Sequence, residues 1–135
     1  MRSPQLRRLE TGKGMFTVLT IDDDEGILTL IATVLERADY TCLQANNGAD
    51  GLELAMTRQP DLILLDDTLP VLPARDVSLE LRSNSYTRHI PIIIFSAAMN
   101  SHNPLYIQEL NGDGLLPKPF RPVELLDLLD SYLRA

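Results

Sequence analysis

One stretch near the middle of the 135-residue chain constrains its fold more than any other: residues 60–70, which read Pro-Asp-Leu-Ile-Leu-Leu-Asp-Asp-Thr-Leu-Pro. Four consecutive apolar residues, 62–65, stand between a proline and a polar cluster, which is typical of a short strand buried on both faces of a sheet. Two carboxylates, Asp66 and Asp67, follow at once. An acid at the carboxyl end of a central parallel strand lies where open α/β sheets bind ligands. Taken alone, Asp66 is better explained as a cap of the next turn.

Apolar and polar residues elsewhere in the chain alternate between strand-like and helix-like patterns. We expect strands over residues 16–21, 40–45, 60–65, 90–95 and 115–116. We expect helices around residues 27–35 and over 48–58, 76–82, 104–110 and 122–133. Asp24 and Asn103 precede two of these helices and are candidate N-caps. Five alternations of strand and helix predict an α/β fold with a doubly wound parallel sheet covered by helices on both faces.

Length and composition limit the remaining possibilities. We expect a single domain over residues 15–135, preceded over 1–14 by a flexible N-terminal arm, the end of a linker or a cloning remnant. A net charge of −7 disfavours nucleic acid as a direct partner. Cys42 is the one cysteine and cannot form an internal disulfide, which favours a reducing compartment. No apolar stretch approaches the length of a membrane span, so a cytoplasmic location without membrane contact is expected.

Chemically useful side chains gather where the predicted strands end. These are Asp22 and Asp23 after the first strand, Asp66 after the third, Ser96 after the fourth and Lys118 after the fifth. In a doubly wound sheet these ends lie side by side, so three carboxylates would repel one another unless a cation neutralises them. Mg²⁺ suits such oxygen ligands, a lysine attracts anionic oxygens, and a serine hydroxyl donates to them.

An aspartate, a metal and a lysine around one point predict a phosphoryl-transfer site with the aspartate as nucleophile. Each residue alone has an ordinary explanation: acids at a helix start, a serine in a turn, a surface lysine. The prediction therefore depends on all of them occurring in this order. Because Asp66 and Asp67 are adjacent, the nucleophile is ambiguous by one residue. The apolar run that ends at Leu65, and Pro70 four residues beyond Asp66, favour Asp66.

With these motifs the chain resembles the receiver domains of two-component response regulators, over about residues 15–134. The motifs that carry the resemblance are Val18-Leu19-Thr20-Ile21-Asp22-Asp23-Asp24, residues 60–66 with Pro70, residues 90–97, and Lys118-Pro119-Phe120. The resemblance implies a flavodoxin-like (βα)5 fold. It implies that the phosphohistidine of a histidine kinase or a phosphotransfer protein donates a phosphoryl group to Asp66. It implies no enzymatic activity beyond self-phosphorylation and slow self-dephosphorylation.

The resemblance also assigns expected roles by position. Asp23 would ligate Mg²⁺ directly, Asp22 would help through water, and the Thr68 backbone carbonyl would complete the protein ligands beside Asp66. Ser96 would be the switch hydroxyl. Lys118 would pair with the phosphoryl oxygens, and the Lys118–Pro119 peptide bond is expected to be cis.

Three positions depart from the family pattern. Asp67 stands where an apolar residue is usual, Ala74 where a glycine is usual, and Leu115 where an aromatic residue is usual. The first two leave the chemistry intact and bear on its rate. Leu115 has no hydroxyl, so a readout through an aromatic side chain on the last strand is not expected. Phosphorylation is instead expected to change association, in a homodimer or with a target, through the fourth helix, fifth strand and fifth helix.

The last helix offers two apolar stripes for that surface. One contains Val123, Leu126, Leu129 and Leu133, and the other contains Leu125, Leu128 and Tyr132. One stripe is expected to face the sheet. The other is either partly exposed or covered by Leu105 and Leu110 of the fourth helix, and the sequence does not choose between these arrangements.

Two further functions stay open. A degenerate receiver would act only as a protein-interaction module. A small flavodoxin-like cofactor binder would need a phosphate loop rich in serine, threonine or glycine after the first strand, whereas residues 22–25 are all acidic. The chain ends directly after its last predicted helix, so no output domain is expected within it. Either a stand-alone receiver or a piece of a longer protein fits.

Overall fold

The computed structural model describes residues 16–97 and 103–134, so the arm predicted over residues 1–14 lies outside the described residues. The described strands form one parallel sheet in the spatial order β2-β1-β3-β4-β5. They are β1 (Thr17–Ile21), β2 (Thr41–Ala45), β3 (Leu62–Asp66), β4 (Ile92–Ala97) and β5 (Gly114–Lys118). The predicted flavodoxin-like doubly wound five-stranded sheet is confirmed.

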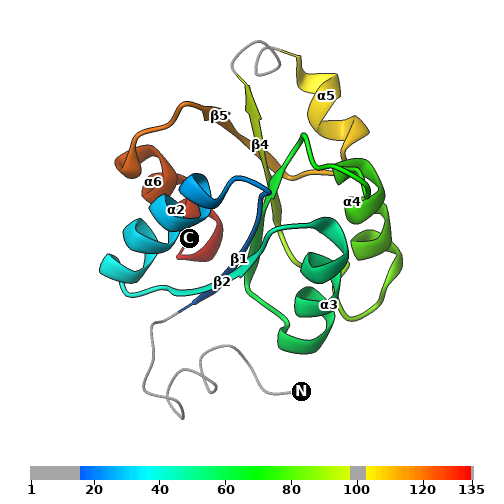
Figure 1. Ribbon diagram of the computed structural model, residues 1–135, viewed down its shortest axis with the longest axis horizontal. Coiled ribbons are helices and arrows are strands. Elements are labelled where there is room, and N and C mark those ends of the chain that lie inside the picture. The colour runs from blue at the N-terminus through cyan, green and yellow to red at the C-terminus, as the bar shows by residue number, and fades with distance from the viewer. Residues whose placement is uncertain (1–15, 98–102, 135) are drawn as a thin grey trace.

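Helices cover both faces of this sheet. They are α2 (Glu25–Arg37), α3 (Gly48–Arg58), α4 (Ala74–Ser83), α5 (Pro104–Glu109) and α6 (Pro122–Leu133). Figure 1 shows α3, α4 and α5 on one side, here called the α3–α5 face, and α2 and α6 on the other, the α2/α6 face. None of the helices in the described part of the chain is long and apolar enough to cross a membrane.

Side-chain caps begin two of the helices as predicted. The Asp24 carboxylate accepts hydrogen bonds from the backbone amides of Gly26 at 2.8 Å and Ile27 at 3.3 Å, at the start of α2. The Asn103 side chain accepts from the backbone amide of Leu105 at 3.0 Å, at the start of α5. Both caps satisfy amides that a helix leaves without an internal partner, and they fix where the two helices begin.

Most element boundaries differ from the predicted ones by only a residue or two, but the strands extend further toward their polar ends. β3 includes Asp66, β4 continues through Ala97, and β5 covers Gly114–Lys118 instead of two residues. The pairing of Asp66 with Phe95 and of Ala97 with Lys118 continues the ladder. Backbone hydrogen bonds do not require apolar side chains, which is why hydrophobicity alone ended these strands too early. Asp66, Ser96 and Lys118 therefore stand on paired strands.

The core is divided between the two faces by the alternation of side chains along each strand. In β3, Leu62 and Leu64 pack on the α2/α6 face, and Ile63 and Leu65 on the α3–α5 face, all of them fully buried. If this alternation continues past Leu65, the Asp66 side chain lies on the α2/α6 face and the Asp67 side chain on the α3–α5 face. One peptide bond thus separates two carboxylates with different surroundings.

The predicted division of α6 into two apolar stripes is wrong. Leu125 and Leu129, one from each stripe, are its buried residues and lie four positions apart. Others from both stripes are partly buried beside them on the α2/α6 face: Leu126, Leu128 and Leu133. An apolar helix face is wide enough to include both narrow stripes, so spacing alone did not separate the inner side from the outer one.

The structure also does not show α5 covering an apolar stripe of α6. Leu110, directly after α5, is buried in the core of the α3–α5 face, while Leu105 is 60% exposed. The two helices lie on opposite faces of the sheet (Figure 1). Val123 and Tyr132 of α6 remain 50% and 36% exposed.

Candidate functional site

The carboxyl ends of β1, β3 and β5 bring together four of the predicted site residues, here called the acid–lysine cluster: Asp22, Asp23, Asp66 and Lys118. Carboxylate oxygens of the three aspartates lie within 4.8 Å of one another. The Lys118 ammonium donates to Asp66 Oδ1 at 2.8 Å and to Asp22 Oδ2 at 3.4 Å. Since Asp22 and Asp66 are each only 1% exposed, these ion pairs are shielded from water.

The acidic residues in the loop after β1 make different contacts. Asp24 caps α2, as described above, while Asp22 Oδ1 accepts from the Asp24 backbone amide at 2.9 Å. This turn holds the Asp22 side chain toward the cluster, and Asp23 beside it is exposed. Asp22 and Asp23 are therefore not the capping acids of α2, which leaves their carboxylates available to the cluster.

Burial and neighbouring charges act in opposite directions on the ionisable groups of this cluster. Burial raises the pKa of Asp22, and the charge of Asp66 adds to the rise. The hydrogen bond from Asp24 and the charge of Lys118 reduce it. Burial lowers the pKa of Lys118, but hydrogen bonds and charges from Asp66 and Asp22 outweigh it, so that the pKa is raised overall. The lysine is held in its cationic form between two carboxylates.

The remaining contacts of Asp66 and Lys118 fix their orientation. Thr68 Oγ1 donates to Asp66 Oδ2 at 3.4 Å, so both carboxylate oxygens of Asp66 have a donor nearby. The Lys118 ammonium lies 5.8 Å from the centroid of the Phe95 ring, and Phe95 stacks on Phe120 at 5.6 Å. The Lys118–Pro119 peptide bond is cis, as expected.

Three further side chains meet on the α3–α5 face and form what is here called the hydroxyl cluster: Asp67, Ser96 and Tyr106. Asp67 Oδ2 accepts hydrogen bonds from Ser96 Oγ at 2.7 Å and from the Tyr106 hydroxyl at 2.5 Å. The fully buried Ser96 hydroxyl, predicted to serve phosphoryl oxygens on Asp66, is thus bonded to the neighbouring carboxylate. Burial, together with the hydrogen bond and charge of Asp67, raises the pKa of Tyr106 to about 12.

Tyr106 was missed by the sequence reasoning. The signal for it was present, because Tyr106 and Leu110 are four residues apart and share the inner side of α5. Asp67 was recognised as unusual, but nothing in the sequence showed that it faces α5 and not Asp66. That information lies in the alternation of β3 across the sheet.

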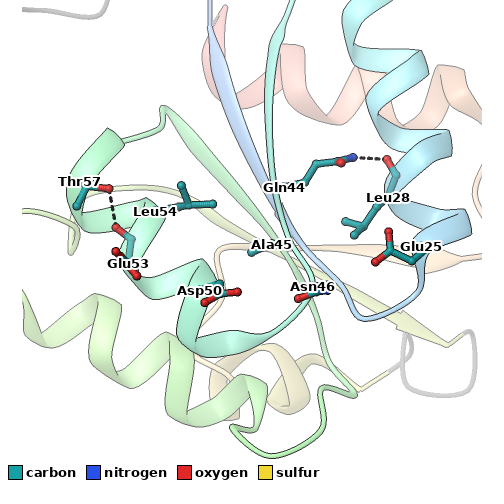
Figure 2. Close-up of a pocket in the computed structure, with 9 residues that line it drawn as sticks. All are labelled: Glu25, Leu28, Gln44, Ala45, Asn46, Asp50, Glu53, Leu54 and Thr57. Carbon is teal, nitrogen blue, oxygen red and sulfur yellow. Dashed lines mark hydrogen bonds between the residues drawn. The ribbon is translucent and has the colours of Figure 1, made fainter.

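A hollow of about 530 Å³ opens between α2 and α3, at the β2 edge of the sheet (Figure 2). Its lining includes three carboxylates, Glu25, Asp50 and Glu53, and no basic side chain. The residues of the acid–lysine cluster do not line it. A cofactor that carries phosphate would be repelled here, so the hollow gives no support to a flavodoxin-like cofactor site.

Comparison with known proteins identifies the class to which this fold and site belong. The family model of the response regulator receiver domain matches residues 18–130, and the chain belongs to this family. It is a receiver domain of two-component signalling systems, and such domains interact with histidine kinases and effector partners.

Individual relatives agree with this assignment. The chain is 37% identical over 118 residues to the phosphate regulon transcriptional regulatory protein PhoB of Pseudomonas aeruginosa, covering 87% of this chain and 52% of PhoB. It is 28% identical over 117 residues to the polar-differentiation response regulator DivK of Brucella anthropi, covering 87% of this chain and 95% of DivK. The chain thus spans about half the length of PhoB, and nearly the whole of DivK.

Solved structures show the same fold. The receiver domain of the sensor histidine kinase PA1611 from Pseudomonas aeruginosa, described with a magnesium ion coordinated in its active site cleft, superposes with a TM-score of 0.81 at 25% identity. It matches 89% of this chain and 98% of that domain. The chemotaxis response regulator CheY4 of Vibrio cholerae superposes with a TM-score of 0.80 at 28% identity, over 87% of this chain and 98% of CheY4.

Proposed function

We propose that this receiver takes a phosphoryl group onto Asp66 from the phosphohistidine of a histidine kinase or phosphotransfer protein. The observation that carries the proposal is the buried Asp66 carboxylate, 2.8 Å from the Lys118 ammonium and within 4.8 Å of two further carboxylates. The PA1611 receiver domain, which has the same fold, is described with a magnesium ion coordinated in its active site cleft.

In the proposed transfer an Asp66 carboxylate oxygen attacks phosphorus, the phosphorus–nitrogen bond of the phosphohistidine breaks, and the imidazole leaves with the bonding electron pair. The Lys118 ammonium, which is already paired with Asp66 Oδ1, would then form an ion pair with the phosphoryl oxygens. Thr68 Oγ1 lies against Asp66 Oδ2 and orients the attacking group.

The donor set fits a hard divalent cation, because it consists of carboxylate oxygens that no single lysine neutralises. Asp23 and Asp66 would hold Mg²⁺ directly, Asp22 through water, and Thr68 through its backbone carbonyl. When bound, Mg²⁺ supplies positive charge for the transferring oxygens. We propose Mg²⁺ as the cofactor on these grounds.

The wider assignments belong to the same proposal. Chemistry by this chain alone is limited to self-phosphorylation from small phosphodonors and slow self-dephosphorylation. The surface that changes its association is formed by α5, β5 and α6, with the edge strand β5 between the two helices. The lone thiol of Cys42 and the receiver family together favour the cytoplasm.

The test is incubation with acetyl phosphate and Mg²⁺ followed by intact mass measurement. We expect the wild type to gain the mass of one phosphoryl group, Asp66→Asn to gain none, and Asp67→Asn to retain the gain. The opposite pattern for the two variants would place the acceptor at Asp67. A folded wild type that gains no mass would favour the degenerate interaction module.

A further inference from the structure

The hydroxyl cluster connects the proposed acceptor to the short helix α5. Asp67 follows Asp66 in the chain, Ser96 comes from the neighbouring strand β4, and Tyr106 comes from α5. One carboxylate oxygen, Asp67 Oδ2, accepts from both hydroxyls. Hydrogen bonds to a charged acceptor are among the stronger ones in proteins, so this oxygen ties β3, β4 and α5 together.

The helix α5 depends on this bond more than a longer helix would. It contains six residues, and none of them is buried. Isolated helices of this length are unstable, so its position rests on its attachments. Those that the described residues show are the Asn103 cap, the packing of Tyr106 and Leu110 on the core, the Tyr106 hydroxyl bond and, directly after the helix, the hydrogen bond from the Arg82 guanidinium to the Asn111 carbonyl at 3.0 Å.

The fifth strand offers no alternative polar link. Leu115 of β5 packs against the apolar core of the α3–α5 face and carries no hydroxyl. Among the described residues that pack against this apolar core, Tyr106 is the one aromatic side chain. Among the described residues, the polar connection from the carboxyl ends of the strands to α5 therefore passes from Ser96 through Asp67 to Tyr106.

We propose that Asp67 is a positioning residue that couples phosphorylation of Asp66 to α5: its Oδ2 holds the Ser96 hydroxyl on the α3–α5 face and anchors Tyr106, and it releases both when a phosphoryl group is present. This inference rests on the function proposed above. A phosphoryl group brings roughly two negative charges and strong acceptor oxygens next to Asp67. The Ser96 hydroxyl turns to those oxygens, Asp67 loses one of its two donors and is repelled, and the Tyr106 anchor weakens.

Hydrogen exchange of the α5 amides, with and without beryllofluoride and Mg²⁺, tests the coupling. In the wild type we expect activation to speed α5 exchange. In Tyr106→Phe the anchor is already lost, so resting exchange should be roughly ten- to hundredfold faster, the effect of one hydrogen bond to a charged acceptor, and activation should add nothing. In Ser96→Ala, Asp67 has already lost one donor, so resting exchange should lie between those of the wild type and Tyr106→Phe, and activation should add less than it does in the wild type.

Tyr40→Phe is the matched control. The Tyr40 hydroxyl donates to Asp130 Oδ1 at 2.9 Å, on the α2/α6 face. This variant also loses a tyrosine–carboxylate bond, but it should keep the resting α5 exchange and the activation response of the wild type. Asp67→Asn, which keeps an acceptor oxygen without the charge, should fall between the wild type and Asp67→Ala in resting α5 exchange.

The outcomes separate this inference from the function on which it rests. Intact mass after acetyl phosphate treatment is measured first, and exchange is compared at equal occupancy of beryllofluoride. A wild type that gains no phosphoryl mass overturns the proposed function and this inference with it. A wild type that gains it, while activation still speeds α5 exchange in Tyr106→Phe as much as in the wild type, overturns the inference alone, because Tyr106 then only stabilises the helix.

Discussion

The acid–lysine cluster contains Asp66 and the hydroxyl cluster contains its neighbour Asp67, yet different forces hold the two clusters together. Asp66 lies among two other carboxylates and a lysine, where charge dominates. Asp67 lies among two hydroxyl groups, where neutral donors satisfy one carboxylate oxygen. The difference shows that the pleat of one strand places two neighbouring carboxylates in different surroundings, one among charges and one among hydroxyl groups, without any change of residue type. Three measurements sharpen or break this distinction.

The largest expected effect is the response to Mg²⁺. At a hundredfold excess of Mg²⁺ over its dissociation constant, we expect the free energy of unfolding to rise by about 2.7 kcal/mol, and the melting temperature to rise with it. Asp23→Ala should abolish this response by removing a ligand, and its metal-free form should be no less stable, because one of three like charges is gone. Asp67→Ala should keep the response. Thermal unfolding with and without Mg²⁺ measures both, and a normal response in Asp23→Ala would exclude Asp23 as a ligand.

A somewhat smaller effect is expected from Lys118→Ala without metal. The lysine side chain is 27% exposed and pairs with two carboxylates that are almost fully buried. Its removal leaves those charges without a partner and should lower the free energy of unfolding by about 2 kcal/mol. Urea unfolding in the presence of a chelator measures this loss.

Arg121→Ala is the comparison variant for Lys118→Ala. It breaks the exposed pair with Glu124 and should change the stability little. Equal losses in the two variants would mean that the Lys118 pairs are as well screened by water as a surface pair. The acid–lysine cluster would then not be governed by charge.

The smallest expected effect is in the pH dependence of stability. The pKa of Asp22 in the folded chain is raised above the usual aspartate value of 3.8, so the unfolded chain loses this proton first as the pH rises. The stability from this carboxyl is therefore complete below pH 3.8 and is lost as the pH rises through the folded pKa. Without metal, the wild type should lose stability relative to Asp22→Asn across this range. Unfolding of both proteins as a function of pH measures it, and a constant difference would contradict the raised pKa.

The sequence by itself determined much of this protein. The alternation of apolar runs and amphipathic segments predicted the doubly wound sheet, because buried strands and half-buried helices need different hydrophobic periods. It also predicted that Asp22, Asp23, Asp66 and Lys118 converge, because parallel strands end at one edge of the sheet. The caps Asp24 and Asn103 followed from local chemistry that involves only a few neighbouring residues.

Other features were decided only by the tertiary structure. Sequence spacing did not separate the buried side of α6 from its exposed side, because several leucines share one wide apolar face and the sheet chooses among them. The partners of Asp67 were not determined either, because Ser96 and Tyr106 lie 29 and 39 residues further along the chain and reach Asp67 only through the pairing of β4 and the packing of α5. Local patterns determine which elements form, whereas contacts between elements distant in sequence depend on how the faces of the sheet are covered.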